Sequence, residues 1–200
     1  MADNTAGNPL QKYFRQPKIY LKLPSNGSYW SENDIEFTEN GDYPVFAMTA
    51  KDELSFKTPD SLLNGQSTVD VIQSCIPNIK NAWNMPSIDL DAVLVAIRIA
   101  TYGEKMDVNT TIPVIEEERT YQLDLRQILD QLIAVNFDNI LPVGDLIIHL
   151  RPLTYREFTN NALKTFEEQR LFSLLDNENI SEEEKLSRFN QSFKKLTELN

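Results

Sequence analysis

The segment 87–102 is the feature that most limits what this chain can fold into. It opens with a serine that can cap a helix, carries Asp89 and Asp91 in the first turn, and stops at Gly103. Its middle is apolar on nearly every side, with Arg98 as its only basic residue. Because a helix that is apolar all round has to be buried, we predict that this helix forms the centre of the core and that most of the fold packs on it.

Short alternating stretches near the N-terminus predict a small antiparallel sheet. In 18–23 every second residue is apolar, which is typical of a half-buried strand. Further extended segments are expected at 35–37 and 43–48, separated by a turn at 39–42. These segments lie close together in the chain, so we expect them to pair.

The middle of the chain predicts a hairpin, a helix and one more strand. Segments 104–114 and 119–123 have the extended character of two hairpin strands. Residues 125–135 repeat apolar side chains at helical spacing, and 146–150 reads as an apolar strand that includes His149. We expect His149 to be a packed, hydrogen-bonded core residue, as most histidines in apolar strands are.

The last quarter of the chain predicts two helices. Thr154 can cap a helix through about residue 175, and Ser181 with Glu184 forms a capping-box pattern for a second helix through about residue 196. An αα-hairpin is the simplest arrangement of the two. The second helix carries an apolar stripe formed by Leu186, Phe189, Phe193 and Leu196.

These elements predict an α+β fold in which a small antiparallel sheet and hairpins pack on a central helix, followed by a C-terminal α-helical hairpin. We divide the chain into a flexible N-terminal arm at 1–16, an α+β core domain at 17–153 and the C-terminal helical hairpin at 154–200. The arm contains no apolar period.

The charge of the chain argues against nucleic acid as a partner. The formal net charge is −11, and nucleic-acid affinity comes chiefly from lysines and arginines that displace counterions. No window reaches the roughly 18 uninterrupted apolar residues of a membrane span, and no secretion signal is visible. We therefore expect no membrane partner and synthesis in a cytoplasm.

Catalytic and cofactor motifs are missing from the sequence. With one cysteine, Cys75, and one histidine there is no HExxH or CxxC, and the scattered glycines form no phosphate loop. We expect Cys75 to be a small apolar helix residue, although a spatial pair with His149 stays open. The glutamates at 116–118 read as a solvated loop in preference to a cation site, because consecutive side chains diverge. We expect no enzyme activity, no catalytic residue, no cofactor and no bound metal.

Three aromatic residues and the apolar stripe are the candidates for partner binding. Tyr29, Trp30 and Trp83 lie next to turns and read as core-edge or interface anchors in preference to platforms for sugars or bases. If the stripe of the last helix faces outward, its phenylalanines would dock in a groove of a partner; if it packs on the rest of the chain, it is structural. The candidate partner-binding residues are Tyr29, Trp30, Trp83, Leu186, Phe189, Phe193 and Leu196.

Six motifs in order carry a family resemblance that covers most of the chain from Phe14 to about Arg170. They are FRQPKIYLKLPS at 14–25, PVFAMTAKDE at 44–53, KTPDSLLNG at 57–65, SCIPNIK at 74–80, DLDAV at 89–93 and AIRIATYG at 96–103. With these motifs the chain resembles the baseplate hub subunit family of T-even-like contractile-tailed bacteriophages and their cyanophage relatives. The resemblance implies a non-enzymatic component of the virion tail baseplate, made in the host cytoplasm.

One departure from the family bears on metal binding. Relatives commonly look as if they carry a CPxC pair before a Tyr-x-Leu-Asp-Leu segment, and the matching residues here are IPVI at 112–115. The zinc knuckle that such a pair suggests needs thiolates, which isoleucines cannot supply. We expect apolar packing to hold this hairpin instead.

Three functions stay open at this point. The chain is a permanent hub subunit that binds other hub proteins, the tape-measure protein and, within the hub, further copies of itself. Alternatively it is an assembly chaperone that holds the same proteins and is absent from the mature virion. The third is a cell-wall hydrolase. The sequence shows no usable carboxylate–histidine or metal set for this activity, but two carboxylates far apart in the sequence could still form a catalytic pair.

Overall fold

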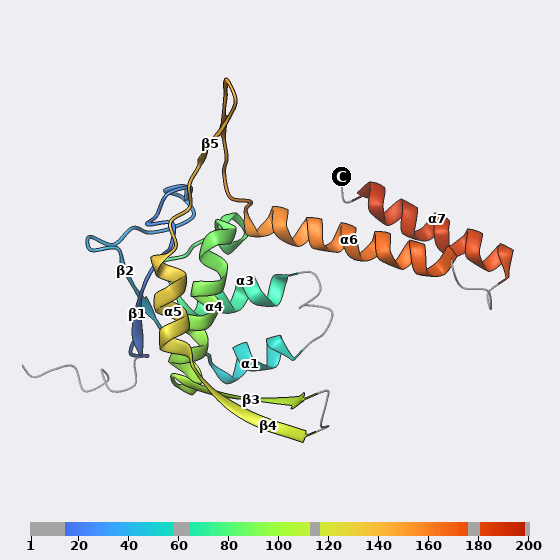
Figure 1. The fold of residues 1–200 in the computed structure, drawn as a ribbon. Helices are drawn as coiled ribbons and strands as arrows, with labels where there is room; N and C mark the ends of the chain where they lie inside the picture. Colours follow the sequence, from blue (N-terminus) through green and yellow to red (C-terminus); the bar gives the residue numbers. More distant parts are fainter. Residues whose placement is uncertain (1–14, 58–64, 113–116, 176–180, 199–200) are drawn as a thin grey trace, which may run out of the picture.

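A computed structural model describes residues 15–57, 65–112, 117–175 and 181–198, and it confirms an α+β fold (Figure 1). Three separate two-stranded antiparallel sheets are arranged around a helical body. Strands β5 and β6 project away from that body at one end, and the two last helices extend from its side.

The predicted central helix is confirmed as α4 (Ser87–Tyr102). One of its faces is closed to solvent along its length, through Val93, Ala96 and Ile97 among others. Its N-cap differs from our expectation, because Pro86 takes that position and no side chain caps the helix. The Ser87 N–H instead donates to the Leu153 carbonyl at 2.7 Å, so α4 begins against the chain segment that leads into the last two helices.

The first sheet pairs β1 (Ile19–Lys22) with β2 (Asp42–Val45) and packs on α4. The predicted alternation is confirmed: Leu21 and Leu23 are buried, whereas Tyr20 points to solvent. The expected strand at 35–37 does not join this sheet. Ile35 makes only an isolated bridge to Ile79, because residues 31–34 turn and direct the chain toward the segment after α3.

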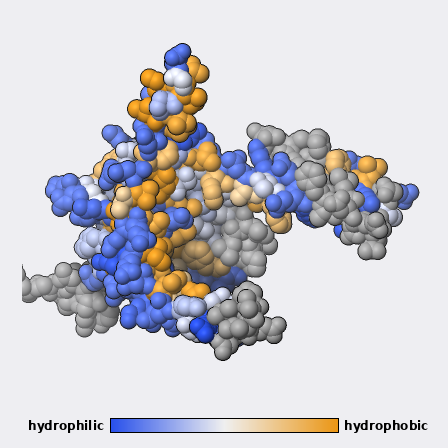
Figure 2. All heavy atoms as spheres, in the orientation of Figure 1, coloured by the Kyte–Doolittle hydropathy of each residue, from blue (hydrophilic) through white to orange (hydrophobic). Residues whose placement is uncertain are grey.

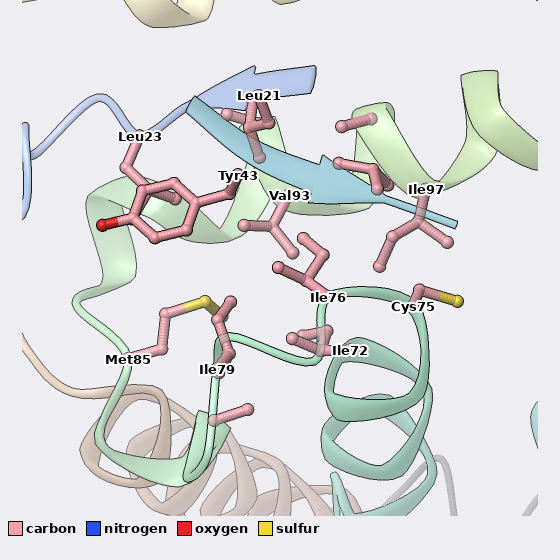
Figure 3. Packing of buried hydrophobic residues seen from close by; sticks show 14 of the residues in the cluster. Leu21, Leu23, Tyr43, Ile72, Cys75, Ile76, Ile79, Met85, Val93 and Ile97 are labelled. Carbon is pink, nitrogen blue, oxygen red and sulfur yellow. The ribbon is translucent and has the colours of Figure 1, made fainter. Parts of the chain in front are cut away.

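Two short helices close the other side of the core. In α1 (Ala50–Phe56), the structure shows a reciprocal capping box between Thr49 and Asp52. Helix α3 (Gln66–Cys75) contributes a face of fully buried side chains. Figure 3 shows how side chains from β1, β2, α3, α4 and the intervening loops meet in one cluster: Leu21, Leu23, Tyr43, Ile72, Cys75, Ile76, Ile79, Met85, Val93 and Ile97.

The predicted second hairpin is present as β3 (Lys105–Ile112) and β4 (Glu117–Asp124). The structure shows polar bonds across this hairpin, and the apolar packing that we expected of Ile112 and Ile115 stays a prediction because their side chains lie outside the described residues. Thr120 donates to the Asn109 side chain at 2.8 Å, and Gln122 donates to Asp107 at 3.2 Å. The tip at 113–116, with most of the IPVI segment, lies outside the described residues.

Helix α5 (Leu125–Ala134) follows directly and packs on α4, as its apolar period predicts. Asp124 caps it by accepting from the Arg126 N–H at 2.9 Å. Leu125 and Leu129 are buried, and the helix leads into β5 (Ile140–Val143) and β6 (Leu146–His149).

Both predicted C-terminal helices are present, as α6 (Tyr155–Leu175) and α7 (Glu182–Glu198). The two helices contact each other, and α7 runs back along α6 (Figure 1), while their connection at 176–180 lies outside the described residues. At the body end, a single turn of 3-10 helix, η2 (Ala82–Asn84), contacts α6.

The predicted arm meets the body through Arg15. Arg15 donates to the Ser74 carbonyl at 2.9 Å and to the Ala47 carbonyl, and its guanidinium lies 5.5 Å from the ring centroid of Phe46. Residues 1–14 lie outside the described part of the chain. Arg15 therefore joins the chain entry to α3 and to the loop before α1.

Candidate protein interface

The β5–β6 hairpin exposes aliphatic side chains to solvent along its whole length. All eight strand residues are exposed, and the exposed fraction of Leu146 and Ile147 is 68% and 67%. Figure 2 shows the hairpin as a largely apolar projection at the top of the molecule. Contiguous apolar surface on a protein marks a site of interaction with another molecule.

The register of the hairpin makes both of its faces apolar. Directly paired residues of antiparallel strands lie on the same face. One face carries the pairs Leu141↔Ile148 and Val143↔Leu146, and the other carries Pro142↔Ile147 and Ile140↔His149. Strands that are apolar on both faces are typical of the interior of a protein, where two layers cover them.

A two-residue turn and a polar clamp hold the hairpin in place. Gly144, with φ +60°, supplies the left-handed conformation that a tight hairpin turn needs. At the base, Arg151 makes two bonds to the Glu157 carboxylate, at 2.6 and 2.9 Å. Glu157 also accepts from the Thr154 N–H at 2.9 Å, in the capping box of α6. The hairpin base is thereby joined to the first turn of α6.

The same clamp affects the charge state of Glu157. The Arg151 guanidinium and then the Thr154 N–H hold the pKa of this carboxyl down at about 2. Since the native state binds this proton more weakly than the unfolded chain, the clamp's contribution is present above the ordinary glutamate pKa and is lost as pH falls toward 2.

Tyr29 also lies at the base of the hairpin, on the β5 side. Its ring meets Phe137, which precedes β5, in an edge-to-face contact with centroids 5.9 Å apart. A groove of about 260 Å³ lies under Phe137, lined mainly by apolar atoms of Pro24, Ile88 and Leu132. Tyr29, which the sequence marked as a partner-binding residue, thus contacts the hairpin base at Phe137, one of the residues that line the groove.

Trp30 is a core residue in the structure, which agrees with the core-edge alternative, and its predicted role in partner binding stays a prediction. It is 9% exposed, and its indole N–H donates to the Asp89 carboxylate of α4 at 2.8 Å. Ser25 donates to the same carboxylate from its N–H at 2.7 Å and from its hydroxyl at 2.6 Å. Three donors therefore converge on one fully buried acid, and they attach the turn after β1 to the central helix.

This attachment also sets the position of Tyr29. Within the turn, Gly27 has φ +80°, and a Cβ at that position would lie 2.9 Å from the Phe37 ring. Tyr29 itself has φ +69°, a conformation that is costly for a bulky residue. The bonds to Asp89 on both sides of it hold the segment in this shape and turn its side chain toward Phe137.

Trp83 lies apart from the hairpin, at the start of α6. It is half-buried, stacks on Tyr155 with centroids 5.6 Å apart, and is covered by the Arg156 guanidinium at 4.9 Å. These contacts within the chain are enough to explain why an aromatic residue occupies this junction. Its predicted role in partner binding stays a prediction.

The predicted stripe of the last helix is described only in part. Leu186 is 62% exposed, and Phe189 is half-buried. The side chains of Phe193 and Leu196 lie outside the described residues. Figure 1 places α7 away from the β5–β6 hairpin, so the structure does not gather the seven predicted residues into one site.

His149 contradicts our prediction of a packed histidine. The strand is present, but the side chain is exposed on the projecting hairpin. The apolar residues around His149 are of the kind that is normally buried. No part of the described chain covers them. Cys75, in contrast, is buried in the core next to Ile72 and Ile76 (Figure 3), so the histidine and the cysteine lie in different parts of the fold.

Cys75 should be almost unreactive in the folded protein. Burial, with a smaller contribution from the Asp52 carboxylate, raises the pKa of its thiol to about 11 against the opposing effect of Arg15. At pH 8 this lowers the thiolate fraction roughly 100-fold relative to the unfolded chain. We expect a thiol reagent to modify native protein at least about 100-fold more slowly than protein in denaturant, measured by absorbance; equal rates would show an accessible thiol.

The described residues contain no group of three His, Cys, Asp or Glu side chains arranged to hold an ion. Across the parts of the chain that the structure describes, no helix combines the length and apolar character needed to cross a bilayer.

Comparison with known proteins gives one match. Residues 16–194 match the model of a family described as T4 bacteriophage base plate protein. No curated protein and no solved structure matched the chain.

Proposed function

We propose that this chain, which belongs to the T4 bacteriophage base plate protein family, is a structural subunit of the baseplate hub that binds other hub proteins and the tape-measure protein. Family membership confirms the coarser part of the resemblance seen in the sequence: a structural role in the phage baseplate, within the virion tail. The hub position, the tape-measure partner and synthesis in the host cytoplasm are the proposed part.

The observation that carries this proposal is the β5–β6 hairpin. Burying an aliphatic side chain is worth about 1.5–3 kcal/mol relative to leaving it in water, and the hairpin leaves several of them in water on two faces. A baseplate subunit functions within an assembly of other proteins, and neighbouring subunits can bury these exposed side chains. The clamp between Arg151 and Glu157 presents the hairpin in a defined position.

We also propose that the chain acts without catalysis. Its only histidine is exposed at the hairpin, its only cysteine is buried, and the described acidic residues form no three-membered cluster with either. This distribution gives no support to a cell-wall hydrolase, which needs carboxylates positioned around a substrate groove.

Quantitative mass spectrometry of purified mature particles tests the proposal. We expect this chain in a fixed ratio to the tail proteins, which serve as the internal standard. The alternative, an assembly chaperone, predicts the chain in assembling baseplates but not in mature particles. Its absence from both would overturn the baseplate hub proposal altogether.

A further inference from the structure

The two outer edges of the β5–β6 hairpin are chemically different. The Leu150 N–H donates to the Asn139 carbonyl at 2.8 Å, so residues 139 and 150 form a hydrogen-bonded pair. Such pairs alternate along an antiparallel ladder. The pairs Pro142↔Ile147 and Ile140↔His149 therefore direct their main-chain groups outward, to the free edges.

The β5 edge has no free outward N–H group. Pro142 has no N–H, and the Ile140 N–H is taken by the Asp138 carboxylate at 3.0 Å. A proline and a local side-chain bond are devices by which natural sheets close an edge against pairing.

The β6 edge is open. Its outward groups are the N–H and C=O of Ile147 and His149, and among the described residues none of these groups has a hydrogen-bond partner. An open edge of this kind is a template for a strand from another molecule, with the main chain giving affinity and the flanking apolar pockets giving specificity.

We infer that another, different baseplate subunit adds a strand to the β6 edge and covers both apolar faces of the hairpin. The inference rests on the proposed function for the identity of the partner. It goes further in naming the contact. An extended segment of the partner pairs with Ile147 and His149, and other parts of the partner cover the two apolar faces of the hairpin.

A second copy of this chain fits the site less well. Two β6 edges paired about a two-fold axis would give a four-stranded sheet whose two apolar faces stay in water. Each copy also brings a formal charge of −11, so association of copies works against charge repulsion. A different subunit that inserts the hairpin between its own layers would cover both apolar faces, and it need not carry the same charge as this chain.

A proline substitution on the open edge tests the inference. His149→Pro removes the outward N–H and leaves the hairpin's own ladder bonds in place, whereas His149→Ala removes the same side chain and keeps the N–H. We expect the proline variant to be incorporated into baseplates at least about tenfold less than the alanine variant, because a lost ladder bond and the pyrrolidine ring both oppose an incoming strand. Incorporation is measured by mass spectrometry in phage whose only copy of the gene carries the variant.

Controls separate the edge from the fold. Ile140→Pro and Ile140→Ala, on the closed β5 edge, should be incorporated equally. Amide exchange at Leu150 reports whether the hairpin ladder is intact in each variant.

Each outcome has one meaning. Equal incorporation of His149→Pro and His149→Ala would overturn strand addition while leaving the hub proposal in place. Wild-type chain missing from baseplates would overturn both. A dimer of the purified chain, detected by light scattering and lost in His149→Pro, would show that a second copy occupies the edge and overturn the choice of a different subunit.

Discussion

Asp89→Ala should lower the free energy of unfolding by about 3 kcal/mol or more, because it strands three buried donors at once. Each unsatisfied buried donor costs about 1–3 kcal/mol, and the Ser25 N–H, the Ser25 hydroxyl and the Trp30 indole all donate to this one carboxylate. For a chain of this length, the melting temperature should fall by about 10 °C. Thermal and denaturant melts of purified protein measure both quantities.

Two variants provide the controls for Asp89. Asp91→Asn lies in the same turn region of α4 but is exposed, so it should change stability by less than about 0.5 kcal/mol. Asp89→Asn keeps one acceptor oxygen and places an amide donor against a donor, so it should fall between the other two. If Asp89→Ala had the same melting temperature as Asp91→Asn, the bonds from Asp89 to the turn after β1 would make no measurable contribution to stability.

The buried position of Asp89 also predicts a pH dependence. Burial raises the pKa of its carboxyl above the ordinary value, and the three donors only partly oppose this. The native state therefore binds the proton more tightly than the unfolded state, so this contribution to stability is present below the ordinary pKa and declines as pH rises through the native pKa. The stability difference between wild type and Asp89→Asn should accordingly shrink as pH rises through that window.

The elements that the sequence predicted well are those specified by local chemistry. Helix α4 has the bounds expected from its apolar middle and Gly103, and helix α5 forms where apolar side chains repeat at helical spacing. The alternation around Leu21 likewise placed β1 correctly. In each case the residues that decide the structure lie within a few positions of one another.

The residues that the sequence did not reveal depend on distant partners. Asp89 read as an ordinary acid in a first helical turn, and nothing near it shows that Ser25, 64 residues away, bonds to it. For the same reason the sequence left Trp30 as a core-edge or interface aromatic and did not reveal its bond to Asp89.

The prediction for the β5–β6 hairpin failed for a different reason. The apolar run around His149 indicates that these side chains need to be covered, but it does not say whether this chain or a partner covers them. A run that is apolar at both odd and even positions next to a tight turn was the available signal.

Replacing one cross-strand pair of the hairpin should separate binding from folding. Leu141 and Ile148 face each other on one apolar face, so Leu141→Lys with Ile148→Glu places opposite charges across the strands and keeps the net charge unchanged. Two aliphatic side chains lost from a partner contact, at about 1.5–3 kcal/mol each, should reduce incorporation into baseplates at least about 100-fold. The melting temperature should stay within about 1 °C of wild type, because both side chains are already exposed in the free chain.

The matched control makes the same change on the other hairpin. Val108 and Tyr121 form a cross-strand pair of β3 and β4, and Val108→Lys with Tyr121→Glu should leave incorporation near the wild-type level. A large loss of melting temperature in the Leu141/Ile148 variant would mean that the hairpin supports the fold. Normal incorporation of that variant would mean that its apolar faces are not the surface that the baseplate covers, and the α7 helix with Leu186 would then be the next surface to test by the same exchange of charge for apolar area.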